Sequence, residues 1–223
     1  MLKRSIIETA DGSKTIKIED WNEQYHSIHG ALQEAKHVYI EAGLKNFLNN
    51  FQYSEIIRIM EIGFGTGLNA YLTAVESNNQ LNKIFYHGIE AYPLKSIELK
   101  KLEYHKITGL DPEVFHKIHK CSWGVEHEIS PNFSIFKRKQ LFSTIDDVNF
   151  FDIIYFDAFG PRVQPELWSE KIFLKMYKAL KPKGVIVTYS AKGSVRRILL
   201  KIGMKVERLA GPPGKREMLR AVK

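Results

Sequence analysis

The sequence predicts a single α/β domain with a doubly wound, mostly parallel sheet covered by helices on both faces. Two observations support this prediction. From residue 55 onward, short apolar runs alternate with segments of helical periodicity, as they do in successive β–α units. The run 151–156 (FDIIYF) is almost continuously apolar, which is typical of a strand buried in the middle of a parallel sheet. Right-handed crossovers between such strands produce the doubly wound arrangement.

The first 54 residues are expected to form an extension packed on the main domain, which would occupy 55–223. Asp11-Gly12 supplies turn chemistry between two stretches of alternating residues, so we expect an N-terminal hairpin over 2–19. Apolar residues then recur at helical spacing across 30–50, which predicts one or two helices.

The main domain is expected to alternate strands and helices in a regular order. Strands are predicted at 56–62, 84–89, 133–136, 151–156 and 184–189, and helices at 68–76, 93–105, 166–180 and 194–202. A final hairpin is expected to pair 205–209 with 217–222, so that the last strand runs antiparallel to the sheet.

The composition is ordinary for a soluble globular protein, with 44% hydrophobic and 26% charged residues among 223. No apolar run approaches the roughly 18 residues that span a bilayer, and the N-terminus lacks a signal-peptide core, so we expect a cytoplasmic protein. A single cysteine, Cys121, excludes an internal disulfide and a multi-cysteine zinc site, and we predict no metal. The net charge of +8 favours nucleic acid or another polyanion, although a lysine-rich composition alone can produce it.

The strongest local pattern is EIGFGTGLN, which extends from Glu61 to Asn69 between an apolar strand and a helix. Gly63, Gly65 and Gly67 allow sharp turns and close approach of a ligand, and the helix start offers free N–H groups. A nicotinamide-binding loop spaces its glycines as GxGxxG, whereas here the third glycine comes one residue earlier. The pattern resembles the first motif of S-adenosylmethionine-binding methyltransferases. The alternative is a turn that only packs the helix on the strand.

A second feature supports a nucleoside-containing cofactor. The strand at 84–89 ends at Glu90, about two dozen residues after the glycine loop, where a carboxylate can accept both ribose hydroxyls. One departure concerns the adenine. Many such enzymes carry an acid after the third strand, but the stretch 136–140 (FKRKQ) has no carboxylate, so Gln140 or a backbone carbonyl would have to replace it.

Asp157 follows the fourth strand directly, in the segment FDAFGP. Groups just beyond strand carboxyl ends line the ligand crevice in open α/β sheets, so Asp157 is expected near the transferred methyl group. The alternative is an aspartate that caps the following turn.

Five stretches resemble, in the same order along the chain, the methyltransferase half of the bifunctional tRNA 5-methylaminomethyl-2-thiouridine biosynthesis proteins (MnmC). These stretches begin at residues 29, 63, 156, 188 and 214 and read HGALQE (with Val38-Tyr39), GFGTGLN, FDAFGP, TYSAKGSVRR and GKREML. The glycine loop is generic to methyltransferases, but the combined set is distinctive and extends over nearly the whole chain.

The resemblance implies a Rossmann-like methyltransferase fold with S-adenosylmethionine as cofactor and tRNA as partner. It implies methyl transfer to the aminomethyl group of a wobble uridine, which gives 5-methylaminomethyluridine. The other half of these proteins is a flavin-dependent oxidase. No sequence follows Lys223 to supply that FAD domain, so we expect a stand-alone methyltransferase whose aminomethyl substrate comes from elsewhere.

The substrate side carries the remaining predicted site residues. Asp157 is the expected catalytic residue, because a protonated amine must lose a proton before it attacks the methyl group. Tyr25 and His29 are expected to line the pocket, although such residues are more often packed or half-buried. Phe159 and Trp168 are expected to stack on the base, the alternative being that they belong to the core. Arg197, Lys215 and Arg216 are expected to contact phosphates, the alternative being a solvated charged face.

Two other classes of function compete with this one. The first is a different enzyme on the same fold, either a small-molecule N-methyltransferase or an aminopropyl transferase. The second is a catalytically silent RNA-binding protein. The presence of the glycine loop, Glu61, Glu90 and Asp157 argues against the silent form.

Overall fold

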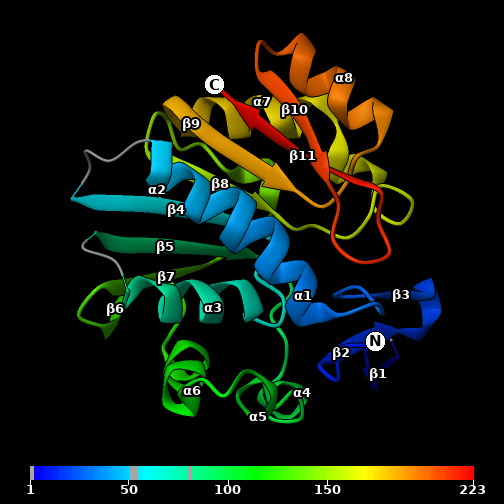
Figure 1. The fold of residues 1–223 in the computed structure, drawn as a ribbon, viewed down its shortest axis with the longest axis vertical. Coiled ribbons are helices and arrows are strands. Elements are labelled where there is room, and N and C mark those ends of the chain that lie inside the picture. The colour runs from blue at the N-terminus through cyan, green and yellow to red at the C-terminus, as the bar shows by residue number, and fades with distance from the viewer. Residues whose placement is uncertain (1–2, 51–54, 80–81) are drawn as a thin grey trace.

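The computed structural model describes residues 3–50, 55–79 and 82–223 and is built around a central eight-stranded sheet (Figure 1). The predicted division of the chain after residue 54 falls at the end of the stretch 51–54, outside the described residues. The strand order is β10-β11-β9-β8-β4-β5-β7-β6. Five parallel strands form the middle of the sheet: β4 (Ile56–Ile62), β5 (Lys83–Glu90), β7 (Phe133–Lys139), β8 (Phe151–Phe156) and β9 (Leu180–Thr188).

Antiparallel strands form both edges of the open sheet. The strand β11 (Glu217–Val222) runs antiparallel to β9 and pairs with β10 (Lys205–Ala210), which confirms the predicted antiparallel last strand. At the opposite edge β6 (Glu126–Ser130) runs antiparallel to β7. The doubly wound, mostly parallel sheet that the sequence predicted is therefore confirmed.

Helices cover both faces of the sheet (Figure 1). One face packs against the helical segment α1 (Ala31–Ala35), η2 (Lys36–Lys45) and α2 (Asn46–Asn50), together with α3 (Leu68–Ser77) and α6 (Pro112–Lys120). The other face packs against α7 (Glu170–Ala179) and α8 (Gly193–Lys201). Alternate residues of a strand enter different cores: Tyr155 lies in the first core, and Ile154 and Phe156 in the second.

The N-terminal hairpin is confirmed: β1 (Arg4–Glu8) pairs with β2 (Lys14–Ile18), and a short β3 (Glu23–Gln24) adds to it. This small sheet lies beside the carboxyl ends of the central strands, so the extension forms one wall of the space above them (Figure 1).

Two of the predicted helices differ from the structure. The helix expected at 93–105 is wrong, because the chain forms only the short α4 (Ser96–Leu99) and α5 (Tyr104–Thr108), separated where Glu103 adopts a φ of 50°. The helix expected at 166–180 is a 3-10 turn, Pro165–Trp168, followed by α7, because Ser169 is extended; Leu180 already belongs to β9.

Sequence reasoning also missed α6 and β6 altogether. A signal for α6 was present, since Asp111 accepts a hydrogen bond from the backbone N–H of Glu113 and Pro112 occupies the first helical position. Within the described residues, no helix is long and apolar enough to cross a membrane, and no cluster of three or more His, Cys, Asp or Glu side chains could hold a metal ion.

Candidate functional site

A cavity of about 1380 Å³ lies at the carboxyl ends of β4, β5 and β8, beneath the N-terminal extension and the β10–β11 loop. Eight of the predicted site residues line its wall: Tyr25, His29, Gly63, Gly65, Glu90, Asp157, Phe159 and Lys215. Glu61, Gly67 and Asn69 lie behind this wall, and Arg197 and Arg216 lie outside it. The fold therefore brings together residues from segments that are far apart in the sequence.

The glycine loop between β4 and α3 requires glycine for two different reasons. Gly63 (φ 90°) lies so close to the end of β8 that a Cβ there would come within 2.5 Å of the carbonyl oxygen of Asp157. At Gly67 (φ 71°), a Cβ would approach the His119 ring to 2.8 Å. The first glycine thus brings the loop against the cavity wall, whereas the third allows α3 to pack against α6.

Glu90, at the end of β5, is held in place by backbone donors. Its Oε2 accepts a hydrogen bond from the N–H of Gly65 at 3.1 Å, and its Oε1 accepts one from the N–H of Tyr92 at 2.9 Å. The carboxylate is therefore fixed between the glycine loop and the β5–α4 connection, with its side chain at the cavity wall.

Asn69 links the two carboxylates at the base of the site. Its Nδ2 donates to Glu61 Oε1 and to Asp157 Oδ2, each at 2.8 Å. The Oδ1 of Asn69 is buried without a hydrogen-bond partner, and the hydroxyl of Tyr86 lies against Glu61. Burial, and then the nearby charge of Asp157, raises the pKa of Glu61 well above its usual value.

Asp157 has a pKa suited to accepting a proton near neutral pH. Its pKa is raised from 3.8 to about 7, first by burial and then by the charge of Glu34, while hydrogen bonds from Tyr39 and Asn69 and the charge of Lys215 partly oppose the rise. The residue follows β8 directly, and its backbone N–H donates to Ile62 O at 2.9 Å, which holds it beside the glycine loop. A carboxylate with this pKa at a cavity wall matches the requirement for a general base.

The chemistry of this end of the cavity fits S-adenosylmethionine. Glu90 and Asp157 line the cavity beside the loop as acceptors, and the glycines provide a close cradle. A sulfonium and an amino group are cationic, so these acceptors complement them, whereas a pyrophosphate would face several carboxylates.

Of the two groups expected to replace the missing acid near the adenine, the structure excludes the side chain of Gln140 and does not test a backbone carbonyl. Gln140 does not line the cavity, and its Oε1 already accepts a hydrogen bond from Arg138 Nε at 2.9 Å. The wall here is formed by Leu141, Phe142 and Ser143, which follow β7 and which sequence reasoning missed. The available signal in the sequence was an apolar residue, Leu141, two positions after the end of the strand.

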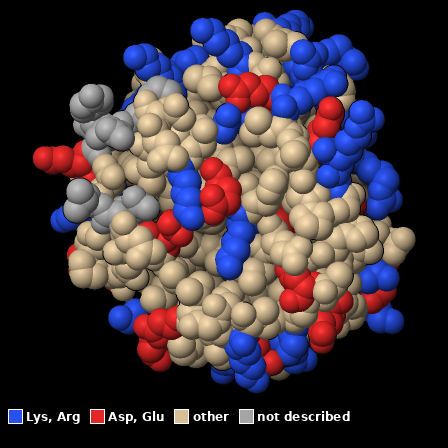
Figure 2. Space-filling view, viewed as in Figure 1, with Lys and Arg blue, Asp and Glu red and all other residues tan. Residues whose placement is uncertain are grey.

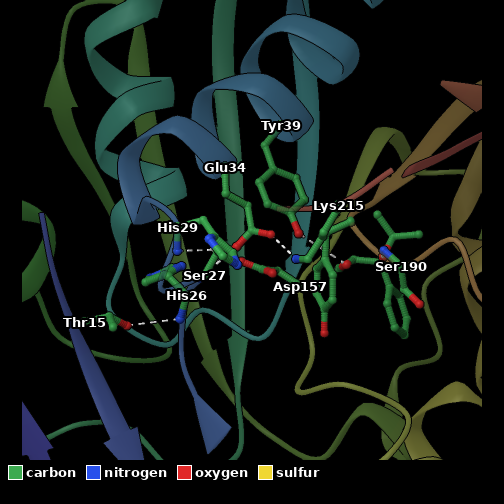
Figure 3. Close-up of polar contacts among 12 residues, drawn as sticks. Thr15, His26, Ser27, His29, Glu34, Tyr39, Asp157, Ser190 and Lys215 are labelled. Atoms are coloured by element: carbon green, nitrogen blue, oxygen red, sulfur yellow. Dashed lines mark hydrogen bonds and ion pairs between the residues drawn. The ribbon is translucent and has the colours of Figure 1, made fainter. Parts of the chain in front are cut away.

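The opposite side of the cavity carries aromatic and charged side chains. Phe159 packs edge-to-face against Tyr25, with ring centroids 4.8 Å apart. Lys215 forms an ion pair with Glu34, as Figure 3 shows, and its Nζ lies 4.0 Å from the centre of the Tyr189 ring. His29 lies against Gly214, where a Cβ would collide with the imidazole ring.

Trp168, which the sequence suggested as a base-stacking residue, belongs to the core instead. It is buried among Phe156 and Phe173, and its Nε1 donates to the carbonyl oxygen of Phe159 at 2.7 Å. The tryptophan thus fixes the backbone that presents Phe159 to the cavity.

Lysine and arginine side chains gather on the side of the molecule that carries α8 and the β10–β11 loop (Figure 2). A shallow groove of about 430 Å³ adjoins the main cavity there, and its wall includes the exposed cations Arg162, Lys192 and Arg216. Arg197 is exposed on the neighbouring helix α8. The three cations of the groove therefore face solvent beside the main cavity.

Comparisons with known proteins agree with this geometry. Residues 126–223 match the model of a family described as S-adenosyl-L-methionine-dependent methyltransferase. Two tRNA 5-methylaminomethyl-2-thiouridine biosynthesis bifunctional proteins MnmC are similar to the chain: that of Marinomonas sp. is 30% identical over 215 residues, and that of Leptospira interrogans is 27% identical over 210. The matches cover 89% and 90% of this chain, but only 31% and 32% of the relatives.

The crystal structure of MnmC2 from Aquifex aeolicus superimposes with a TM-score of 0.78 at 25% identity, over 99% of this chain and 70% of that one. The chain is an S-adenosylmethionine-dependent methyltransferase domain similar to that of MnmC. This MnmC-like domain spans about a third of the length of the curated relatives it matches. The cofactor predicted from the glycine loop is confirmed as S-adenosylmethionine by the family match.

Proposed function

We propose that this MnmC-like domain transfers a methyl group from S-adenosylmethionine to the aminomethyl group at carbon 5 of a wobble uridine, with or without 2-thiolation, in tRNA. The observation that carries the proposal is the placement of Asp157, with a pKa of about 7, at the cavity wall beside the glycine loop. The similarity to proteins named for 5-methylaminomethyl-2-thiouridine biosynthesis supports the choice of substrate.

The cofactor is held by the residues around the glycine loop. Gly63 and Gly65 let the backbone approach the ligand, and Glu90 accepts the ribose hydroxyls. Glu61 and Asn69, which lie behind the cavity wall, support the cofactor site through the hydrogen bonds that Asn69 Nδ2 donates to Glu61 and Asp157, and Gly67 supports them by packing. Bound S-adenosylmethionine supplies an electrophilic methyl group on a sulfonium.

Asp157 prepares the amine for attack. A primary ammonium forms a charge-assisted hydrogen bond with the carboxylate, which orients the nitrogen toward the methyl group. Transfer of one proton from the ammonium to Asp157 exposes the lone pair of the nitrogen. The amine could then attack the methyl group that S-adenosylmethionine would supply, and no further acid would be needed. The pKa of about 7 leaves the carboxylate able both to accept this proton and to release it to water.

The RNA is received on the opposite side of the cavity. Phe159, held by Tyr25 and Trp168, offers an aromatic face to the unpaired base, and His29 closes the wall beside it. Two exposed cations, Arg216 in the outer groove and Arg197 on α8, contact phosphates. Lys215, which the sequence placed with them, is instead engaged with Glu34.

The decisive experiment is nucleoside mass spectrometry of tRNA from cells that lack this protein. We expect aminomethyluridine to accumulate at the expense of its methylated form, and the purified protein to restore methylation with S-adenosylmethionine. Unchanged tRNA would favour a small-molecule N-methyltransferase or an aminopropyl transferase. Failure of the purified protein to bind the cofactor in calorimetry would instead favour a silent RNA-binding protein.

The RNA surface gives a separate prediction. The affinity for tRNA should fall steeply with salt, because each phosphate contact releases counterions. Replacing Arg197 and Arg216 together with alanine should reduce the slope of log affinity against log salt by about 1 to 2. Binding measured across a salt series checks this, with Lys205→Ala, an exposed lysine on β10, as the matched control. An unchanged slope would place the RNA surface elsewhere.

A further inference from the structure

The ammonium of Lys215 occupies a small cage inside the cavity. On one side it is paired with the carboxylate of Glu34, whose side chain is only 8% exposed, and on another it lies 4.0 Å from the centre of the Tyr189 ring. Glu34 comes from α1 and Lys215 from the β10–β11 loop (Figure 3), and Tyr189 follows β9. A carboxylate and an aromatic face together form a recognition site for an organic cation.

The two walls of this cage are held by contacts that do not involve Lys215. The second oxygen of Glu34 accepts a hydrogen bond from the N–H of Ser27 at 2.9 Å. The hydroxyl of Tyr189 donates to the carbonyl oxygen of Ala158 at 2.8 Å. Because Ala158 directly follows Asp157, this bond holds the tyrosine close to the predicted catalytic residue. The cage would therefore persist if the lysine ammonium moved away.

Lys215 has an alternative place to go. The residue lines both the cavity and the shallow outer groove, and so does Tyr189. Its ammonium is carried on a flexible four-carbon stem, and the groove already collects Arg162, Lys192 and Arg216. A phosphate bound in that groove would offer the displaced ammonium a new partner.

We propose that the cage formed by Glu34 and Tyr189 recognises the ammonium of the substrate beside Asp157, which takes its proton, and that Lys215 is an internal substitute for this ammonium which the substrate must displace. The inference rests on the proposed function, because it identifies how that site selects a primary amine. A free amine must compete with the ammonium of Lys215 for the cage. When the amine is carried on RNA, a phosphate of that RNA gives the displaced lysine a new partner. The pair thus favours amines attached to a polyanion.

The test measures the binding of 5-aminomethyluridine as a free nucleoside, by calorimetry or NMR titration, with S-adenosylhomocysteine present to prevent turnover. Because Lys215→Ala empties the cage, it should bind the nucleoside about 10-fold or more tightly than the wild type does. Uridine, which lacks the amine, should show no gain. Lys205→Ala removes an exposed lysine outside the cavity and should leave both affinities unchanged.

A second variant connects the gain to the carboxylate. Adding Glu34→Gln to Lys215→Ala should remove the increased affinity, with thermal melting used to verify that the double variant is folded. If Lys215→Ala binds the aminomethyl nucleoside no more tightly than the wild type, or gains equally for uridine, the inference is overturned. Unchanged cellular tRNA together with a gain in amine affinity would refute the proposed function but leave the cage intact.

Discussion

Asp157→Asn should lower turnover on aminomethyluridine tRNA by about 100- to 10,000-fold, the range typical for loss of an acid–base group. Asparagine keeps the size of the side chain and can still accept a hydrogen bond from Asn69 Nδ2. In the proposed mechanism, the substitution removes the negative charge that orients the ammonium and the group that takes its proton. Steady-state kinetics with saturating cofactor and tRNA from cells lacking the protein measures the effect.

The pH profile separates this role from a structural one. Because the pKa of Asp157 is about 7, the wild-type rate should rise with pH through that value as the carboxylate forms. The asparagine variant should lack this step, and high pH should partly rescue it, since more of the amine is then already deprotonated. A profile identical in shape to that of the wild type would assign the proton transfer to another group.

Stability provides the control for Asp157→Asn. The folded state raises the pKa of Asp157 from 3.8 to about 7, so its contribution to stability is present at low pH and is lost as pH rises through about 7. At pH of about 8 the variant should therefore melt no lower than the wild type and bind S-adenosylmethionine normally. If stability or cofactor affinity falls by the same factor as turnover, Asp157 is a cap or a cofactor ligand.

The parallel strands of this fold were predictable because each contains a short apolar run with a clear end. The run 151–156 is buried throughout, and the glycine loop follows β4 as expected. The region 93–130 was not predictable in the same way, because its helices are short and are interrupted by turns. Glu103, for example, adopts a left-handed conformation, which glycine or asparagine would usually indicate in a sequence, and neither stands at this position.

The site was predictable where a residue follows a strand end, and less so where distant segments meet. Glu90 and Asp157 line the cavity because the carboxyl ends of parallel strands share one edge of the sheet. Glu34 and Tyr189 belong to stretches that carried the family resemblance, but the sequence analysis assigned neither residue a function. Their pairing with Lys215 depends on the β10–β11 loop reaching α1 across 181 positions of the chain, which no local pattern indicates.

Gly65→Val should reduce the affinity for S-adenosylmethionine by about 100-fold or more, through backbone strain combined with the loss of a charge-assisted hydrogen bond. Gly65 has a φ of 49°, which a β-branched residue rarely adopts. A Cβ there would lie 3.0 Å from Cδ1 of Tyr25, so the ring or the loop must shift at the cavity wall. Such a shift would also weaken the bond from the Gly65 N–H to Glu90.

Gly109→Val is the matched control, because it introduces the same backbone strain at a positive φ but no contact with a cavity side chain. Gly109 has a φ of 65°, and a Cβ added to it would meet nothing within 4 Å. It follows α5 and does not line the cavity. Both variants should therefore lose similar stability in thermal melts, while calorimetry should show lost cofactor affinity only for Gly65→Val. Equal affinities in the two variants would mean that the glycine loop serves packing alone, and that the cofactor is bound elsewhere in the cavity.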